Sequence, residues 1–527
     1  MGASRTPTAR RRKWDADISP LLRPLVRAYL LGYASAVAPR LLTLLLQLIK
    51  SRRRNQKTEQ QASSESSSST VTQQASQEPF FASLKRVLCG GLDPQRFPTF
   101  CAVLVGGSTL LEIPLRAAFN RLLRNLSEVA RKRLSRWFAS FIAAWFSLQL
   151  LQSNQSSGFF TETVPIKKQS DDPDSTTTTT TTKYQTIRYA GRTLDLSLFA
   201  ATRALDVIGG ELWHRRHNLF SSPSHPPLSP SPKRRRPPCL TSSTVTHLTD
   251  PAIFALSSGL IMWAWIYLPS RLPRAYNRWI ASAAAVDPRL IEALQLCRSR
   301  AIRYGVDTGR APLLAAMCAD YRLPPRWGDP AVSVPFPCEL VHMGCGPSCE
   351  RHALSRFARS FRWAMATYLP LNLLLAVRAA GRGPAALMKS LQRALVSAAR
   401  SSSFLGAFIA LFYYGVCLMR TRLGPRVLGT GREVRQRIDG GLCVAAGCVL
   451  CGWSIMLENA GRRKDMALFV APRALATLLP RRYAWDMQWR ETFVFSFSTA
   501  VVFTCVLENR ARVRGVLGGV LASVLKP

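Results

Sequence analysis

The chain has 527 residues, with 71 Lys and Arg against 30 Asp and Glu, which gives a formal net charge of +41. This length exceeds one ordinary domain, and so basic a chain is expected to meet an anionic partner, either nucleic acid or a membrane surface. Apolar runs alternate with Arg and Lys clusters, which favours the membrane and argues against a nucleic-acid-binding module. Most of the thirteen cysteines are expected to be reduced packing residues.

The N-terminal region combines a basic tail, an apolar segment and a polar linker. Residues 1–20 form the tail, and residues 21–54 are predicted to form an amphipathic or short membrane helix with a basic flank. Residues 55–79 are rich in Ser and Gln and are predicted to be a disordered linker. Residues 41–54 look like a site for a peroxisomal membrane-protein import receptor, and a plain membrane anchor fits them equally well.

Residues 80–268 are predicted to form a first membrane unit, with disordered polar insertions at about residues 152–183 and 221–249. Its apolar runs are residues 97–119, 137–151 and 251–268. Glu112 and Arg116 lie four residues apart in the first of these runs, and this spacing predicts an intramembrane ion pair on one helix face.

The second half of the chain is predicted to hold a head and a second membrane unit. Residues 269–336 are basic and predict surface helices, and residues 337–400 form a cysteine-rich head with an amphipathic to apolar helix. Residues 401–510 are the second unit, with uncharged runs that lack strand alternation, and residues 511–527 are a tail. We therefore predict an all-α integral membrane protein with six to ten membrane-embedded helices.

Two short segments match each other without gaps. Residues 195–205 read DLSLFAATRAL and residues 465–475 read DMALFVAPRAL, so seven of eleven positions are identical. Each segment follows a small-residue apolar run and precedes an uncharged run. This order of elements occurs twice and predicts two pseudo-repeated multi-helix units, as in many duplicated membrane proteins.

Each repeated segment carries one acidic and one basic residue. The pairs are Asp195 with Arg203 and Asp465 with Arg473. One interpretation places them in a polar seam between the halves, where intramembrane charge tends to be functional. The interpretation we favour is an interfacial helix whose arginines extend to the headgroups, because both segments are short and amphipathic.

Cysteine and histidine residues gather within fifteen residues at the start of the head. They are Cys338, His342, Cys345, Cys349 and His352. Thiolate and imidazole are preferred ligands of zinc, and four of these residues would suffice for a structural site. Because the spacing is unlike that of common zinc modules, the alternative is a compact cap on the following helix. We expect no other cofactor.

The head and the second unit resemble a known family. The resemblance rests on Cys338, His342, Ser348-Cys349, Ala353-Leu354, Tyr368-Leu369-Pro370-Leu371, Ser402-Ser403-Phe404-Leu405, Ile455-Met456-Leu457-Glu458 and Arg462-Arg463. On these residues the chain is similar to the transmembrane protein 135 family, also called peroxisomal membrane protein 52, over residues 338–510 and more loosely over residues 97–268. In animal members the head lies near the N-terminus, whereas here it stands between the units in a fungal-type order.

The resemblance implies a multi-pass protein of peroxisomal or mitochondrial membranes, with a role in organelle division, morphology and lipid handling. We expect it to bind lipids, including anionic headgroups, or partner proteins such as the import receptor and the division machinery; a homo-oligomer is compatible with this role. The alternative is a transporter or channel for lipids or metabolites built from two repeated units. No nucleophile–base constellation or phosphate loop is visible, so we expect neither an enzyme nor a nucleic-acid binder.

Overall fold

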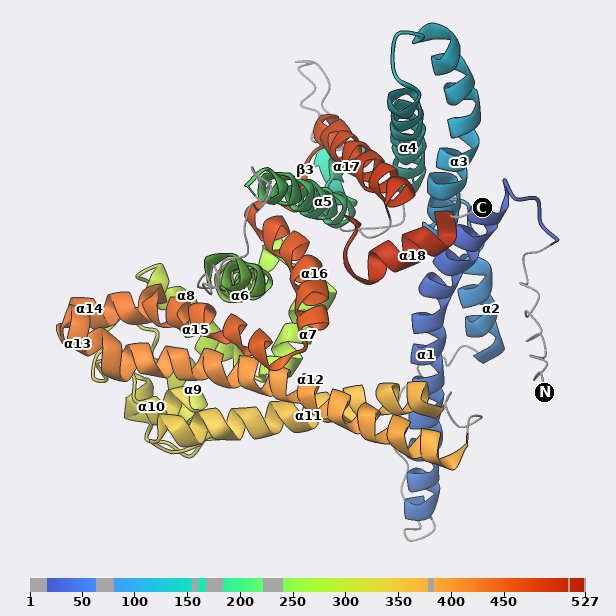
Figure 1. Cartoon of the computed structure of the whole chain (residues 1–527). Coiled ribbons are helices and arrows are strands. Elements are labelled where there is room, and N and C mark those ends of the chain that lie inside the picture. Colours follow the sequence, from blue (N-terminus) through green and yellow to red (C-terminus); the bar gives the residue numbers. More distant parts are fainter. Residues whose placement is uncertain are drawn as a thin grey trace, which may run out of the picture. The chain divides into compact units, whose positions relative to one another are not determined.

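The computed structural model describes residues 17–62, 80–153, 160–166, 183–220, 240–377, 383–509 and 512–525. The chain is mostly helical there and divides into two compact units (Figure 1). The first unit is Met1–Ser222 with Arg482–Pro527, and the second is Pro223–Arg481. Most of the predicted basic tail and large parts of the three predicted linkers lie outside the described residues.

The first unit is a bundle of helices. They are α1 (Arg23–Ala62), α2 (Phe80–Gly90), α3 (Phe97–Leu122), α4 (Glu128–Gln152), α5 (Leu194–Phe220), the 3-10 turn η7 (Trp485–Met487), α17 (Gln488–Glu508) and α18 (Gly515–Leu525). Figure 1 shows α3 and α4 side by side as a hairpin. Ser127 ends the short loop between them and caps α4 by accepting a hydrogen bond from the Ala130 amide. Helix α1 packs on α3, and α17 packs on both α4 and α5.

A small antiparallel sheet joins this bundle. Its strands are β1 (Thr161–Ile166), β2 (Lys183–Ala190) and β3 (Tyr483–Ala484), in that order. The described chain is still mostly helical, in agreement with the predicted helical membrane class, and the sheet adds only three short strands. Strand β1 lies inside the insertion at residues 152–183 that was predicted to be disordered. Strand β1 reads TETVPI, and its β-branched residues suit a pleated strand whose backbone pairs with β2.

The regular elements of the second unit are all helical within the described residues. Its elements are α6 (Leu240–Tyr267), η1 (Pro269–Arg271), α7 (Arg274–Ala284), α8 (Pro288–Arg298), α9 (Ala311–Asp320), η2 (Pro325–Gly328), α10 (Cys338–Val341), α11 (Cys349–Val377), α12 (Pro384–Leu418), η4 (Met419–Leu423), α13 (Gly424–Leu428), α14 (Arg432–Arg437), η5 (Ile438–Leu442), α15 (Cys443–Cys451), η6 (Gly452–Leu457) and α16 (Ala460–Leu478). The long helices α11 and α12 lie side by side (Figure 1). Helices α7, α8 and α9 fall in the range predicted to hold surface helices.

Five helical segments of the described chain are long and apolar enough to cross a membrane. They are Phe97–Leu122, Leu248–Tyr267, Pro384–Leu428, Arg432–Leu457 and Trp485–Glu508. The prediction of a helical membrane protein is thus supported, with fewer spans than the six to ten expected. Helix α4 covers the predicted run at residues 137–151 but is not among the five. Its N-terminal half carries the basic residues of the preceding loop, which lowers its mean hydropathy.

Helices extend further than the predicted linkers and tail allowed. Helix α1 continues to Ala62, inside the predicted linker, and α6 begins at Leu240, inside the second predicted insertion. Helix α18 occupies the predicted C-terminal tail, where Val524 and Leu525 are buried against the first unit. The predicted tail is a helix because the segment GVLGGVLASVL can bury apolar side chains on the helices of the first unit.

The two compact units do not follow the predicted ranges of residues 80–268 and 401–510. Helix α6 packs in the second unit, against α15, η6 and α16, and α17 packs in the first. Close contact between small residues holds α6 in the second unit. A Cβ atom on Gly452 would lie 2.3 Å from the Ala255 Cα, so the two backbones touch only because position 452 is glycine.

Glycine also lets α12 and α15 approach each other. A Cβ atom on Gly415 would lie 2.8 Å from the Gly447 Cα, and one on Gly447 would lie 2.8 Å from the Phe412 carbonyl oxygen. Gly447 belongs to the run at residues 440–457, which is rich in small residues that let helices approach closely. The core around this contact includes Phe412, Val444 and Cys448.

Candidate functional site

Three cysteines and one histidine converge in the second unit. Cys338 begins α10, His342 follows its last residue, and Cys349 begins α11. Cys417 lies near the end of α12, within a candidate membrane span. The chain between α10 and α11 therefore turns back so that its two ends meet the end of α12.

The donor atoms of these residues lie close together. The ligand atoms of Cys338, His342 and Cys349 are all within 4.8 Å of one another. The Sγ atom of Cys417 lies 3.3 Å from His342 Nε2, and the Cys338 and Cys349 thiols are near enough to affect it electrostatically. All four are donors that soft or borderline metal ions prefer, and the three cysteines are free thiols.

The imidazole of His342 is held in one orientation. It is fully buried, and its Nδ1 lies 2.7 Å from the Gly346 carbonyl oxygen. Because a carbonyl oxygen only accepts, Nδ1 carries the proton and Nε2 presents a lone pair toward Cys417. Gly346 has φ +89°, a left-handed conformation that favours glycine and directs its carbonyl back to the ring.

Two of the five predicted metal ligands lie outside this group. His352 stacks on His342 with ring centroids 4.4 Å apart, and Tyr413 packs edge-on against its other side at 5.1 Å. Neither His352 nor Cys345 contributes a donor atom to the cluster among the described residues. His352 lies one turn beyond Cys349 on α11 and is buried as a packing residue, which explains why it is not a ligand.

Burial controls the protonation of the cluster. It raises the pKa of the Cys338 thiol to about 11 and lowers the pKa of His342 below its ordinary value. Burial, with the neighbouring His342 and Arg356, lowers the pKa of His352 to about 3. At neutral pH the Cys338 thiol is therefore protonated and both imidazoles are neutral, so a bound metal ion would displace thiol protons.

A buried ion pair lies next to the cluster in the same unit. Arg420 Nε donates to Asp439 Oδ1 at 2.5 Å, and its Nη2 donates to Asp439 Oδ2 at 2.9 Å and to the Phe336 carbonyl at 3.0 Å. The hydroxyl of Tyr304 donates to the same carboxylate. Burial and this carboxylate raise the pKa of Tyr304 well above its ordinary value, which keeps the hydroxyl a donor.

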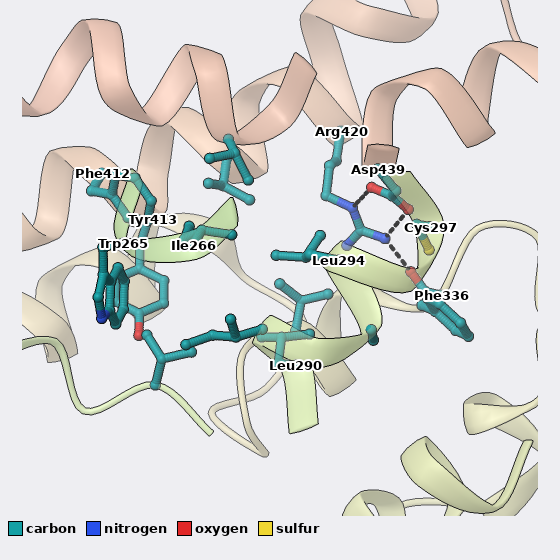
Figure 2. A pocket seen from close by; sticks show the side chains of 16 residues that line it. Trp265, Ile266, Leu290, Leu294, Cys297, Phe336, Phe412, Tyr413, Arg420 and Asp439 are labelled. Carbon is teal, nitrogen blue, oxygen red and sulfur yellow. Dashed lines mark hydrogen bonds and ion pairs between the residues drawn. The ribbon is translucent and has the colours of Figure 1, made fainter. Parts of the chain in front are cut away.

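The ion pair closes one end of a small apolar cavity of about 50 Å³. Figure 2 shows Arg420 and Asp439 at that end, next to Phe336, with Trp265, Phe412 and Tyr413 at the other end. The two charged side chains are 5% and 3% exposed. They connect the end of α12 to η5 and to the segment before α10, so this pair holds the head segment on the membrane helices.

A larger apolar cavity lies in the first unit. Its volume is about 420 Å³, within the range of ligand pockets, and α1, α3, α5, α17 and α18 all contribute to its wall. Representative lining residues are Leu31, Leu104, Ala200, Phe503 and Leu521. Two of these helices, α3 and α17, are long and apolar enough to cross a membrane, so the cavity is chemically suited to an acyl chain.

Arg203 is the one charged side chain among the described residues that line this cavity. It is 6% exposed, its Nη1 donates to the Arg514 carbonyl at 3.4 Å, and its guanidinium lies 5.2 Å from the Phe199 ring centroid. Arg514 in turn pairs with Asp206 at 3.8 Å. A buried guanidinium beside an apolar cavity can bind an anionic group that enters with an apolar chain.

The repeated Asp and Arg residues take different environments. Arg473 in α16 donates to the Phe469 carbonyl at 2.8 Å and stacks over the Phe469 ring at 3.7 Å, so it interacts within its own helix. Asp195 and Arg203 are eight residues apart in one helix, as are Asp465 and Arg473, which separates their Cα atoms by about 12 Å. The two residues of each segment therefore lie about two helical turns apart, and of the four it is Arg203 that lines the cavity described above.

The predicted Glu112–Arg116 pair is also corrected. Glu112 Oε1 accepts from Arg136 Nε of α4 at 2.8 Å, and Arg116 lies 3.9 Å from Glu128. Both contacts join α3 to α4, because the hairpin brings the basic start of α4 beside the end of α3. Sequence spacing within one helix could not reveal this partner on another helix.

Sequence reasoning missed two of the residues that define these sites. Cys417 lies in an apolar run and belonged to the cysteines expected mostly to be packing residues, and Asp439 stands just before the apolar run at residues 440–457. An acidic residue directly before one uncharged run, together with Arg420 directly after the preceding run, was the available signal for the ion pair.

No protein-family model, no curated protein and no solved structure matches this chain. The resemblance of residues 338–510 to the transmembrane protein 135 family therefore stays an expectation from the sequence. The function has to be inferred from the cavity, the buried ion pair and the cysteine–histidine cluster.

Proposed function

We propose that this chain is a multi-pass membrane protein that binds a lipid in the cavity of its first unit. The observation that carries the proposal is the cavity itself, about 420 Å³ in volume and lined almost entirely by apolar side chains. In a membrane such a space is filled by hydrocarbon, because an empty apolar cavity loses dispersion contacts. Phe100, Leu104 and Phe503 would contact the acyl chain.

Arg203 gives the site a preference for anionic lipids. Its guanidinium lies at the cavity wall and can donate paired hydrogen bonds to a phosphate or carboxylate. The formal net charge of +41 supports the same preference, since basic segments next to a membrane concentrate anionic lipids at its surface. The proposed ligand class is thus an acyl lipid with an anionic headgroup.

In the cell, lipid binding would serve to regulate or organise peroxisomal membranes, with mitochondrial membranes as the alternative location. The resemblance to the transmembrane protein 135 family supports this setting. The import receptor and the division machinery are the corresponding proposed partners, and self-association is compatible with the role. Imaging the full chain against peroxisomal and mitochondrial markers tests the location directly.

We further infer that the two units are pseudo-repeats that exchange their last helix. The contact pattern supports this inference: α3 packs on α4, and α17 on α4 and α5, while α12 packs on α15, and α6 on α15 and α16. The matching segments at residues 195–205 and 465–475 lie in α5 and α16, which hold equivalent places in this order. Duplicated membrane units also occur in transporters, so lipid transport is the second candidate function.

The lipid site is tested by photo-crosslinking of the purified full chain in nanodiscs with a diazirine-labelled phosphatidic acid. We expect crosslinks in α3, α5 and α17. Ala200→Trp would fill the cavity and lower the crosslinking at least about fivefold, the factor that corresponds to about 1 kcal/mol. Leu205→Trp is the matched control, because Leu205 lies on the same helix and is 64% exposed.

A second pair of variants tests the headgroup preference. Arg203→Gln should reduce crosslinking of phosphatidic acid relative to phosphatidylcholine, whereas Arg473→Gln, at the equivalent position of the repeat, should leave that ratio unchanged. Equal loss in Leu205→Trp and Ala200→Trp would contradict the cavity as the site. Transfer of a fluorescent lipid between liposomes by the wild type, lost in Ala200→Trp, would favour transport over static binding.

A further inference from the structure

We propose that Cys338, His342, Cys349 and Cys417 form a structural zinc site that fastens the cysteine-rich head to the end of α12. Three thiolates and one imidazole are a donor set found in four-coordinate structural zinc sites. This site lies in the second unit and is independent of the lipid cavity in the first. The sequence had suggested a metal site with Cys345 and His352 among the candidate ligands and without Cys417.

The distances fit one tetrahedral ion. Zinc–sulfur bonds of about 2.3 Å at tetrahedral angles place neighbouring sulfur atoms about 3.8 Å apart. The donor atoms of Cys338, His342 and Cys349 lie within 4.8 Å of one another, and His342 Nε2 lies 3.3 Å from the Cys417 Sγ. A contraction of about 1 Å would bring Cys338, His342 and Cys349 to coordination distance, and Cys417 would join them from its position beside His342 Nε2.

The surroundings of His342 match those of a metal ligand. Metal-binding histidines usually donate their second ring N–H to a carbonyl or carboxylate, which fixes the tautomer and the ring orientation. His342 donates Nδ1–H to the Gly346 carbonyl at 2.7 Å, which leaves Nε2 for the metal. The stacked ring of His352 further fixes the plane of the imidazole.

The charge balance is compatible with zinc. Three thiolates and one divalent cation leave a net charge of −1, and the guanidinium groups of Arg420 and Arg356 are close enough to affect the thiol or imidazole groups electrostatically. Binding releases the thiol protons to solvent, and no oxidant is required, since zinc keeps one oxidation state. Coordination would close the loop between α10 and α11 and connect it to α12, in addition to the hydrogen bonds of Arg420 to Asp439 and the Phe336 carbonyl.

The test is the metal content of the full chain, purified in detergent without chelators and analysed by inductively coupled plasma mass spectrometry. We expect about one zinc per chain, as for a closed four-ligand site. Cys349→Ser and Cys417→Ser should each lower the zinc content at least about tenfold, since loss of even an outer-shell partner costs that much affinity. Cys345→Ser is the matched control, because Cys345 lies in the same loop without contributing a donor, and it should keep the zinc.

Cobalt substitution provides a readout that does not depend on the variants folding. Wild-type protein loaded with Co²⁺ should show thiolate-to-cobalt charge transfer and the intense d–d bands of a tetrahedral site. The proposal is overturned if the wild type stays metal-free after incubation with zinc and shows no thiolate–cobalt bands. It is also overturned if the wild type carries a Cys338–Cys349 disulfide, or if Cys345→Ser loses as much zinc as Cys349→Ser.

Discussion

Each compact unit contains a hairpin of helices that is closed by an ion pair, and the two pairs differ in burial. In the first unit Glu112 of α3 meets Arg136 of α4, with side chains 20% and 18% exposed. In the second unit Arg420, just after α12, meets Asp439 in η5, with side chains 5% and 3% exposed. A pair that keeps solvent contact contributes little to stability, whereas a fully buried pair becomes costly once one partner is removed.

The largest loss of stability is expected when one partner of the buried ion pair is removed. Asp439→Leu leaves the Arg420 guanidinium buried without its carboxylate and should lower the free energy of unfolding by about 3–5 kcal/mol. Tyr304 also loses its acceptor in this variant. Thermal unfolding of the purified chain in detergent, followed by tryptophan fluorescence, measures the loss.

Removing both charges distinguishes the contribution of the ion pair to stability from that of the packing around it. Arg420→Met combined with Asp439→Leu should recover a large part of the lost stability, because no unpaired charge then remains in the core. A double variant as unstable as Asp439→Leu alone would show that the network to Tyr304 and the Phe336 carbonyl matters more than the charges.

A smaller loss of stability is expected from substitutions at a glycine that lets two helices approach closely. Gly447→Val places a side chain against the Phe412 carbonyl, only 2.8 Å from the new Cβ, and should destabilise the second unit by about 1–3 kcal/mol. The counterpart in the first unit is Gly107→Ala, whose Cβ would lie 3.1 Å from the Ala143 side chain and should be tolerated better. The same unfolding assay compares them, and an equal loss in both variants would remove this distinction between the units.

These contrasts show how far the sequence could predict the fold. Apolar runs identified the regions of five possible spans, because hydropathy and length are local properties. They could not reveal that α6 packs in the second unit and α17 in the first, since this depends on which helix offers a complementary surface, as Ala255 does to Gly452.

The candidate sites show the same limit. Cys338, His342 and Cys349 stood out because they are close in sequence, and the structure brings their donor atoms together. Cys417 is 68 residues beyond Cys349 and looked like one more cysteine in an apolar helix. Only the return of the chain through α11 and α12 places it beside His342.

The smallest effect is expected at the ion pair of the first unit. Glu112→Gln keeps the size of the side chain and removes its charge, and it should cost about 0.2–1 kcal/mol, because Arg136 retains access to solvent. Raising the salt concentration should reduce the difference between this variant and the wild type, since partly exposed charges are screened. A loss as large as that of Asp439→Leu, or one that salt does not change, would mean that the α3–α4 pair is buried in the membrane-embedded protein. In that case burial in the membrane would determine the strength of both pairs, and the contrast between the two units would disappear.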